Sequence, residues 1–250
     1  MENQLTDRTF WTNYWESKPD LAISIDKNYL FHQYLEQVVL KDKSKTAIEL
    51  GGFPGYYSIF LKKYLHVEAT LFDYFIHPGI LKKVLEKNNL NEHDITLIEA
   101  DLFQYKATKK YDLVLSCGLI EHFKDTKDIL ARHLEFLNPN GTLFITLPNF
   151  RGVNGWVQKT FDRDNYEKHH IECMDPKLLK KFMEELGLDV IKSSYIGNYS
   201  VWLENRDQKS GLTKAFIKSI WFIGKVFTKI FPFESKALSP YILLEAKKKS

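Results

Sequence analysis

The chain is poor in cysteine and has no long uncharged apolar run. Its 250 residues include two cysteines, Cys117 and Cys173. Two thiols do not make a disulfide framework, so we expect a reducing compartment. No segment reaches the roughly 18 uncharged apolar residues of a membrane-spanning helix, and the polar residues 1–10 lack the apolar core of a secretion signal. These absences predict a cytoplasmic protein.

An excess of charge of one sign is also missing. The formal net charge is +3, whereas a nucleic-acid-binding protein usually carries a concentrated basic face. We therefore expect no nucleic-acid partner. Hydrophobic residues make up 44% and charged residues 27% of the chain, as in ordinary globular proteins. Such a chain can bury a core, and its length fits one domain, with or without decorations.

Short apolar runs alternate with helical patterns through the middle of the chain. The runs typical of strands are 46–50, 67–72, 94–99, 111–116 and 142–147, and the helical patterns between them are 56–64, 78–88 and 125–137. This alternation predicts a parallel sheet covered by helices on both faces. In such sheets, ligands bind beyond the carboxyl ends of the strands.

Two further features precede the first strand. Residues 26–40 have a helical pattern with Asp26 as a candidate N-cap, and the expected buried face is Leu30, Phe31, Tyr34, Leu35 and Val38. Residues 10–15 hold a dense aromatic cluster. Such a cluster must cover something apolar, which is either the core or a ligand.

The first three predicted strands all end at acidic side chains. The first strand carries Glu49 and runs into a glycine-rich turn at 51–55, while Asp73 and Asp101 follow the next two strands. Glycine lets the backbone approach a ligand closely. At one edge of the sheet, Glu49 can reach a cationic amine, Asp73 both hydroxyls of a ribose, and Asp101 the exocyclic amine of an adenine.

Each acid also has a structural explanation, as a turn residue or a helix cap, but three at successive strand ends are hard to attribute to coincidence. A nicotinamide-binding fold is a competing interpretation. That fold uses a three-glycine turn to place a pyrophosphate at a helix N-terminus, and the turn at 51–55 lacks this spacing.

The order of these motifs resembles that of class I S-adenosylmethionine-dependent methyltransferases, of the small-molecule type found in quinone biosynthesis. Residues 48–55 resemble the first motif, Asp73 the ribose-binding acid, and residues 101–102 the adenine-binding pair. Residues 119–123 are similar to the Glu-His segment after the fourth strand. The likeness covers residues 46–148 well and extends more weakly through residues 170–176.

The resemblance implies an α/β fold with a doubly wound, Rossmann-like sheet of seven mostly parallel strands, the last of them antiparallel. The predicted division is an N-terminal helical cap at 1–45, a methyltransferase core at 46–204 and 238–250, and an apolar helical insert at 205–237. The implied cofactor is S-adenosylmethionine. The implied cofactor-binding residues are Tyr14, Glu49, Gly51, Gly52, Gly55, Asp73, Tyr74, Asp101, Leu102 and Cys117.

One position departs from the family pattern. The first motif usually has a second glycine where this chain has Phe53, so the ring of Phe53 must point away from the cofactor. The departure leaves a second function open, namely a non-catalytic S-adenosylmethionine-binding or scaffold protein. Cys117 ends a buried strand, where a small core residue is favoured over a nucleophile.

Histidines are the candidate bases for transfer to a hydroxyl or thiol. The candidates are His122, after the fourth strand, and His169 and His170, after the fifth, and we predict His122 or His170 as the catalytic residue nearest the transferred methyl group. The structural alternatives are a backbone-tied helix start for His122 and a surface polar pair for His169 and His170. Glu121-His122 and His169-His170 also offer metal ligands. However, Gly118 stands where some quinone O-methyltransferases carry an additional glutamate, so we predict no metal.

The link between the predicted last two strands, 186–190 and 241–246, is long and contains the apolar, aromatic segment 215–233. Its lysines, at 218, 225 and 229, fall on roughly one helical face, which is the composition of an interfacial helix. The alternatives are packing on its own domain, a homodimer interface, contact with a membrane surface, and a lid over a lipid-like acceptor.

The acceptor should be small and partly apolar or lipid-like, and methylated on oxygen or another heteroatom. Residues 10–15 and 149–174 are expected to close the cleft and exclude water from the sulfonium, with the apolar insert around Trp221 nearby. A nucleic-acid methyltransferase is disfavoured, because residues 116–119 replace the usual Asn-Pro-Pro-Tyr-type segment.

Overall fold

The computed structural model describes residues 3–18, 20–204 and 206–249. Residues 1, 2, 19, 205 and 250 lie outside this description. They belong to the predicted N-terminal cap, the predicted insert and the end of the predicted core.

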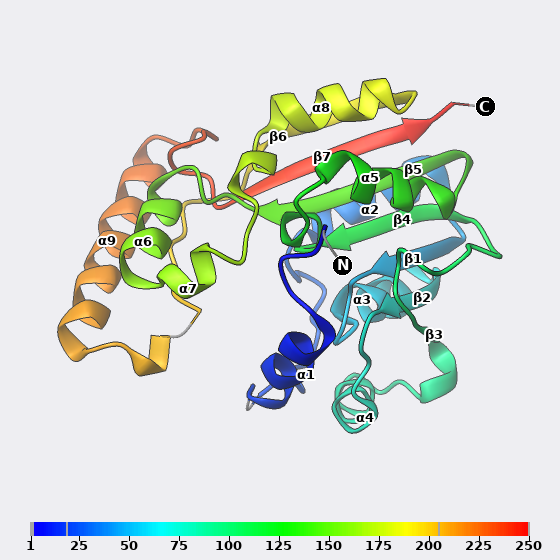
Figure 1. Ribbon diagram of the computed structural model, residues 1–250, viewed down its shortest axis with the longest axis horizontal. Helices are drawn as coiled ribbons and strands as arrows, with labels where there is room; N and C mark the ends of the chain where they lie inside the picture. Colours follow the sequence, from blue (N-terminus) through cyan, green and yellow to red (C-terminus); the bar gives the residue numbers. More distant parts are fainter. Residues whose placement is uncertain (1–2, 19, 205, 250) are drawn as a thin grey trace.

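A single seven-stranded sheet with the strand order β3-β2-β1-β4-β5-β7-β6 forms the centre of the molecule (Figure 1). The strands are β1 (Thr46–Leu50), β2 (Glu68–Asp73), β3 (Thr96–Glu99), β4 (Tyr111–Cys117), β5 (Leu137–Pro148), β6 (Leu188–Ile196) and β7 (Tyr241–Lys248). The first five strands pair in parallel, and β7 runs antiparallel to both β5 and β6. The predicted sheet of mostly parallel strands with an antiparallel last strand is confirmed.

Helices cover both faces of this sheet. One face packs against α5 (Thr126–Glu135) and α8 (Pro176–Glu185), and the other against α2 (His32–Asp42), α3 (Tyr56–Leu65) and α4 (Pro78–Lys87). Successive strand residues point to opposite faces. In β4, for example, Val114 joins the first core and Leu115 the second. Both layers therefore follow from apolar strands that are buried on two sides.

The remaining helices lie at the ends of the sheet. They are α1 (Arg8–Glu16), α6 (Val153–Phe161), α7 (Arg163–Tyr166), α9 (Gly211–Ile230) and the short 3-10 helices η1 (Glu92–Asp94), η2 (Ile120–His122), η3 (Ile171–Cys173) and η4 (Arg206–Gln208). In Figure 1, α6, α7 and α9 form a group beyond one end of β7, and α1 lies near the ends of the central strands.

The helix predicted at 26–40 begins later than expected. Asp26 does not cap it, because its Oδ1 accepts the backbone N–H of Asn28 at 2.7 Å in a turn. This local bond competes with helix formation. Phe31 then takes a left-handed conformation (φ 66°) and precedes α2. Leu30 is 44% exposed and lies off the predicted buried face, whereas Phe31, Leu35 and Val38 are buried.

The predicted sixth strand is also displaced. It was expected at 186–190 and extends as β6 to Ile196, beginning after Gly187, which has a φ of 83°. β6 continues through the polar Ser193 and Ser194 because it is an edge strand that pairs with β7. An edge strand needs no apolar run on both faces, so its sequence pattern is weak.

The insert between β6 and β7 has a small core of its own. Ile217 of α9 packs with Val157 of α6 and with Tyr199. At the crossing point, a Cβ atom on Gly224 would come within 1.9 Å of the Tyr199 ring. Glycine at this position therefore lets the helix axis approach the ring.

Replacing Gly224 by Ala tests this contact. Alanine favours a helix over glycine by about 1 kcal/mol, but the clash with Tyr199 should cost about 1–3 kcal/mol as overpacking. We expect the variant to unfold at lower urea concentration than the wild type. Gly211→Ala, in the same helix, meets nothing within 4 Å and should be neutral or stabilising. A Gly224→Ala variant as stable as Gly211→Ala would contradict the contact, and Tyr199→Leu should rescue the clash.

Candidate functional site

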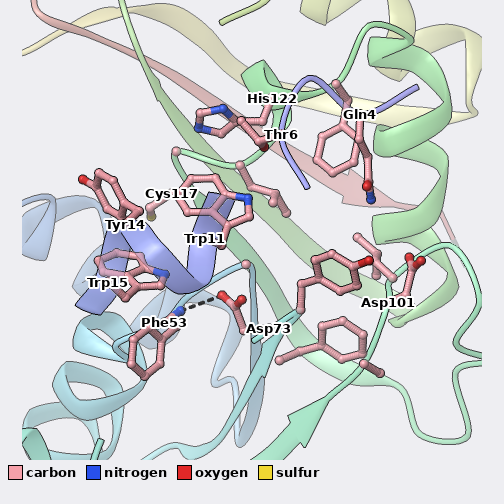
Figure 2. A pocket seen from close by; sticks show the side chains of 18 residues that line it. Gln4, Thr6, Trp11, Tyr14, Trp15, Phe53, Asp73, Asp101, Cys117 and His122 are labelled. Carbon is pink, nitrogen blue, oxygen red and sulfur yellow. Dashed lines mark hydrogen bonds between the residues drawn. The ribbon is translucent and has the colours of Figure 1, made fainter. Parts of the chain in front are cut away.

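A cavity lies beyond the carboxyl ends of β1, β2 and β4 and beneath α1 (Figure 2). It brings together most of the residues that the sequence predicted for the cofactor and the acceptor. These are Tyr14, Gly51, Asp73, Tyr74, Asp101, Leu102, Cys117 and His122. The predicted residues that do not line it are Glu49, Gly52, Gly55 and His170.

The glycine turn folds back onto the end of β2. The backbone N–H groups of Gly51 and Gly52 both donate to the carbonyl of Phe72, at 2.8 and 3.4 Å. Gly51 has a φ of 62°, and a Cβ atom there would come within 2.5 Å of the Leu119 side chain. The backbone conformation therefore favours glycine at this position, and a larger residue would also displace the end of the Leu119 side chain.

Asp73 is held by backbone amides at the base of the cavity. Its Oδ2 accepts the N–H of Phe53 at 2.9 Å (Figure 2), and its Oδ1 accepts the N–H of Phe75 at 3.1 Å. Burial raises the pKa of Asp73 to about 6, although these amides oppose the shift. Each carboxylate oxygen has a further lone pair, so Asp73 can accept hydrogen bonds from two ligand hydroxyls.

Asp101 has a more exposed position on the same cavity. Its carboxylate accepts the N–H of Phe103 at 2.8 Å and the side-chain amide of Gln104 at 3.0 Å. Asp101 is thus a turn residue as well as a wall of the cavity. Leu102 and Phe123 lie beside it and supply apolar surface.

Glu49 lies beneath the glycine turn rather than in the cavity. It is 2% exposed, and its Oε2 accepts both the N–H and the hydroxyl of Ser58, at 2.7 and 2.6 Å. A Cβ atom on Gly52 would come within 2.2 Å of the Glu49 side chain. Burial raises the pKa of Glu49 to about 7. Glu49 therefore supports the turn from below and does not face the cavity.

Phe53 belongs to the lining of the cavity, but its ring is packed almost entirely against other side chains. The ring is 3% exposed, belongs to the core on the α3 side of the sheet, and packs edge to face on Trp15 at a centroid distance of 5.2 Å. The backbone of Phe53 faces Asp73. The residue that departs from the family pattern therefore joins the turn to α1.

The aromatic N-terminal segment forms the opposite wall of the cavity, where residues 10–15 were expected to lie. Trp11, Tyr14 and Trp15 of α1 line it, and the rings of Trp11 and His122 pack edge to face with their centroids 5.0 Å apart. The N–H of Leu5 donates to the carbonyl of His122 at 2.8 Å, so the segment is tied to the chain after β4. Sequence reasoning did not assign Trp11 or Trp15 individually, although their cluster was the available signal.

The two predicted catalytic histidines are placed differently. His122 is buried and lines the cavity. His170 does not, because its Nδ1 lies 3.3 Å from the hydroxyl of Thr126 and its Nε2 lies 3.8 Å from Glu172. The neighbouring His169 contacts His122 instead, with ring centroids 4.8 Å apart. Neither His169 nor His170 is among the residues that line the cavity.

The other segments that were predicted to close the cleft, residues 149–174 and the apolar insert, do not line the cavity: among the described residues, none of 149–174 or 206–237 does so. The segment after β5 reaches it only indirectly, through the contact of His169 with His122. Trp221 lies on α9, which packs on the separate core with Tyr199. The apolar wall of the cavity therefore comes from α1 rather than from the insert.

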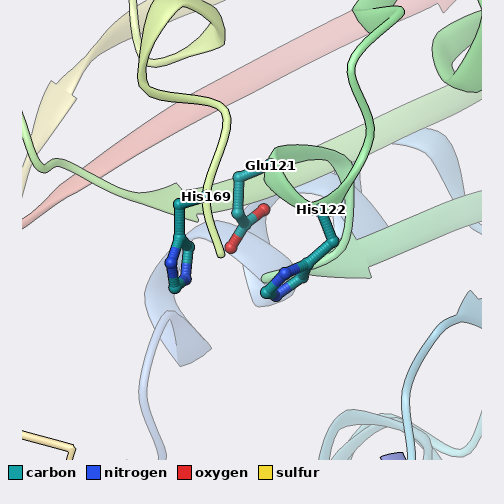
Figure 3. A group of neighbouring side chains, drawn as sticks. All are labelled: Glu121, His122 and His169. Carbon is teal, nitrogen blue, oxygen red and sulfur yellow. The ribbon is translucent and has the colours of Figure 1, made fainter. Parts of the chain in front are cut away.

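Glu121, His122 and His169 form a compact group (Figure 3), of which His122 alone lines the cavity. One ligand atom from each lies within 4.8 Å of the others. Burial raises the pKa of Glu121 to about 8 and lowers that of His122 to about 3. Among the described residues, these three side chains have ligand atoms of the right kind, close enough together, to hold a metal ion.

The sequence matches a family model for a methyltransferase domain over residues 25–193. The chain belongs to this methyltransferase family. A Papaver bracteatum protein named "Probable (S)-tetrahydroprotoberberine N-methyltransferase 2" is 26% identical over 140 residues, which cover 55% of this chain and 38% of that protein. The match thus spans well under half of the relative's length.

Solved structures support the same fold. The phosphoethanolamine N-methyltransferase 2 of Haemonchus contortus, in complex with S-adenosylmethionine, superposes with a TM-score of 0.60 at 14% identity and covers 88% of this chain and 53% of that one. The N-methyltransferase NodS of Bradyrhizobium japonicum WM9, in complex with S-adenosylhomocysteine, gives 0.51 at 12% identity and covers 99% and 95%. The predicted class I, S-adenosylmethionine-dependent methyltransferase is confirmed as family and fold.

A prediction follows from the buried position of Glu49. Its folded pKa of about 7 exceeds that of an unfolded glutamate, about 4.3. Between these values the unfolded chain ionises first, so this residue lowers stability as the pH rises. Without cofactor, Glu49→Gln should therefore gain about 2–3 kcal/mol relative to the wild type between pH 5 and pH 7.5, at 1.36 kcal/mol per pKa unit.

Urea unfolding at the two pH values measures this gain. Glu86→Gln, at an exposed position, should leave the pH dependence of the wild type unchanged. If the Glu49→Gln and wild-type profiles run parallel, Glu49 is already ionised in the folded protein.

Proposed function

We propose that this chain transfers the methyl group of S-adenosylmethionine to a small, partly apolar acceptor, on oxygen or another heteroatom. The observation that carries the proposal is that Asp73, Asp101 and the Gly51 turn line one cavity in a chain that belongs to a methyltransferase family. Each supplies a different contact to such a cofactor.

In this proposal the cofactor lies across the ends of the central strands. Asp73 accepts the ribose hydroxyls, with Tyr74 beside it, and Asp101 with Leu102 holds the adenine. The turn at Gly51 and the end of β4 at Cys117 are left for the methionine part. Glu49, Gly52 and Gly55 do not line the cavity. In this proposal they act indirectly, by setting the shape of the turn.

The acceptor then occupies the part of the cavity beneath α1. Trp11, Trp15 and Leu119 offer apolar surface there, which excludes water and suits an acceptor with an apolar body. His122 is a polar group on this side, as are Thr6 and Tyr14. Its Nδ1 bonds the carbonyl of Lys168 at 3.1 Å, which leaves Nε2 to orient the heteroatom that receives the methyl group. Orientation of this kind is the main demand of a displacement on an activated cofactor.

The non-catalytic alternative is not favoured. It rested on Phe53 in the first motif, and the ring of Phe53 packs against Trp15 and the core. The cavity therefore remains open beside Asp73. The similar proteins in the comparisons are named as N-methyltransferases, so amines belong among the acceptors to be tried.

Asp73→Asn tests the cofactor site. Losing a charge-assisted acceptor should weaken S-adenosylmethionine binding roughly 10- to 100-fold by calorimetry, at about 1.5–3 kcal/mol. Because burial holds the pKa of Asp73 near 6, the wild-type affinity should also fall as the pH drops below 6 and Asp73 gains a proton. The matched control is Asp189→Asn, at an exposed position. Unchanged affinity in Asp73→Asn would rule out the assignment.

Release of S-adenosylhomocysteine from labelled cofactor tests the reaction. Amine, hydroxyl and thiol compounds with an apolar body are the first acceptors to screen, and Asp73→Asn should lower the turnover of any that react. A wild-type protein that does not bind the cofactor would contradict the proposed function outright.

The exposed side of α9 supports a second part of the proposal, contact with a membrane surface. Large apolar side chains stay exposed along it, among them Phe222 at 62% and Ile223 at 67%. Lys218, Lys225 and Lys229 are its nearby charges, and α9 contains no acidic residue. No helix in the described part of the chain has the length and apolarity to cross a membrane. Apolar bulk flanked by lysines suits an anionic lipid surface.

Vesicle sedimentation tests this contact. We expect binding to vesicles that contain an anionic lipid, weakened by salt, and at least about a tenfold loss for Phe222→Ser combined with Ile223→Ser, since each such side chain contributes about 1.5–3 kcal/mol when buried. Leu40→Ser, at an exposed position on α2, is the matched control. A protein that ignores vesicles but dimerises through Phe222 and Ile223 would replace the lipid by a second copy of the chain.

A further inference from the structure

Three metal-ligand side chains converge behind the cavity wall, and the proposed methyl transfer does not account for their arrangement. Glu121 and His122 are adjacent in η2, and His169 arrives from the loop after α7. The backbone joins the two segments, because the N–H of His170 donates to the carbonyl of Glu121 at 2.6 Å. Figure 3 shows the three side chains pointing toward one another.

Both histidines are held in a tautomer that leaves Nε2 free to bind a metal ion. The Nδ1 of His122 lies 3.1 Å from the carbonyl of Lys168, and the Nδ1 of His169 lies 2.7 Å from the carbonyl of Asn165. A carbonyl can only accept, so each Nδ1 carries the proton and each Nε2 keeps a lone pair. Metal-binding histidines almost always donate their other ring N–H in this way.

The carboxylate of Glu121 lacks the partners that a buried carboxylate usually has. Glu121 is 1% exposed, and within the part of the chain that the structure describes its Oε2 has no hydrogen-bond partner. Leaving such an oxygen unpaired costs free energy. A cation held by Glu121 and the two histidines would remove this cost.

We propose that Glu121, His122 and His169 bind a divalent first-row transition-metal ion. Two imidazoles and one carboxylate suit Zn²⁺, Co²⁺ or Mn²⁺ better than Mg²⁺ or Ca²⁺, which prefer oxygen ligands. The ligand atoms, within 4.8 Å of one another, must move closer together to share an ion with bonds of about 2.0–2.2 Å.

The ion would have an open coordination position, because three protein ligands do not fill its shell. His122 lines the cavity, so that position lies on the cavity side of the group. Because the ion would take up the Nε2 of His122, the ion rather than the ring would then bind the acceptor heteroatom and polarise it. This last role rests on the proposed function, whereas metal binding itself does not.

Cobalt binding tests the site directly. The untagged full chain is freed of metal with a chelator and titrated with Co²⁺, because Zn²⁺ has a filled d shell and gives no visible bands. We expect one equivalent to bind with visible ligand-field absorption and to be displaced by Zn²⁺. Glu121→Gln and His169→Ala should each weaken binding at least about 100-fold, since loss of an outer partner alone costs about 10- to 100-fold.

His170→Ala is the matched control, because it removes the adjacent histidine, which is not in the group. It should bind Co²⁺ as tightly as the wild type. The proposal is overturned if the wild type binds no Co²⁺, or if Glu121→Gln and His169→Ala bind it with wild-type affinity while circular dichroism shows them folded. Calorimetry with S-adenosylmethionine on the same samples separates the two proposals, because neither Glu121 nor His169 lines the cavity.

Discussion

The hydrogen bonds between the turn after β1 and the end of β2 hold the candidate site together. Parallel pairing sets Leu50 opposite Phe72, so the turn and Asp73 must leave the sheet side by side. The amides of Gly51 and Phe53 then bond the last residues of β2. As a result, the acid at the base of the cavity is positioned by main chain on both sides, and it cannot shift unless the sheet shifts too.

The aromatic cover depends on this same turn. The backbone N–H of Phe53 donates to Asp73, and the Phe53 ring packs against Trp15. This one residue therefore connects the sheet to α1. A glycine there would keep the first contact and lose the second. The departure from the family pattern thus anchors α1, which is also tied through Leu5 to the chain after β4, through Tyr14 to Glu204 and through Arg8 to Glu99.

Buried carboxyl groups are concentrated at this end of the molecule. Glu49, Asp73 and Glu121 are all buried, and burial raises the pKa of each. Groups of this kind lower the stability of a fold and tend to gather at functional sites. The apolar side chains buried in the two cores of the sheet supply the stability that offsets the cost of burying these acids.

The sequence by itself determined the order of strands and helices, the acids at the strand ends and the glycine turn, because these follow from local periodicity and from rules that hold wherever parallel strands end. Only the tertiary structure decided that Glu49 lies under the turn, that α9 packs away from the cavity, and that His169 rather than His170 meets His122. These outcomes depend on contacts between distant segments, such as the bond from His170 to the carbonyl of Glu121. In an irregular loop no repeating pattern tells which of two adjacent side chains turns inward, so the bond that fixes the backbone makes the choice.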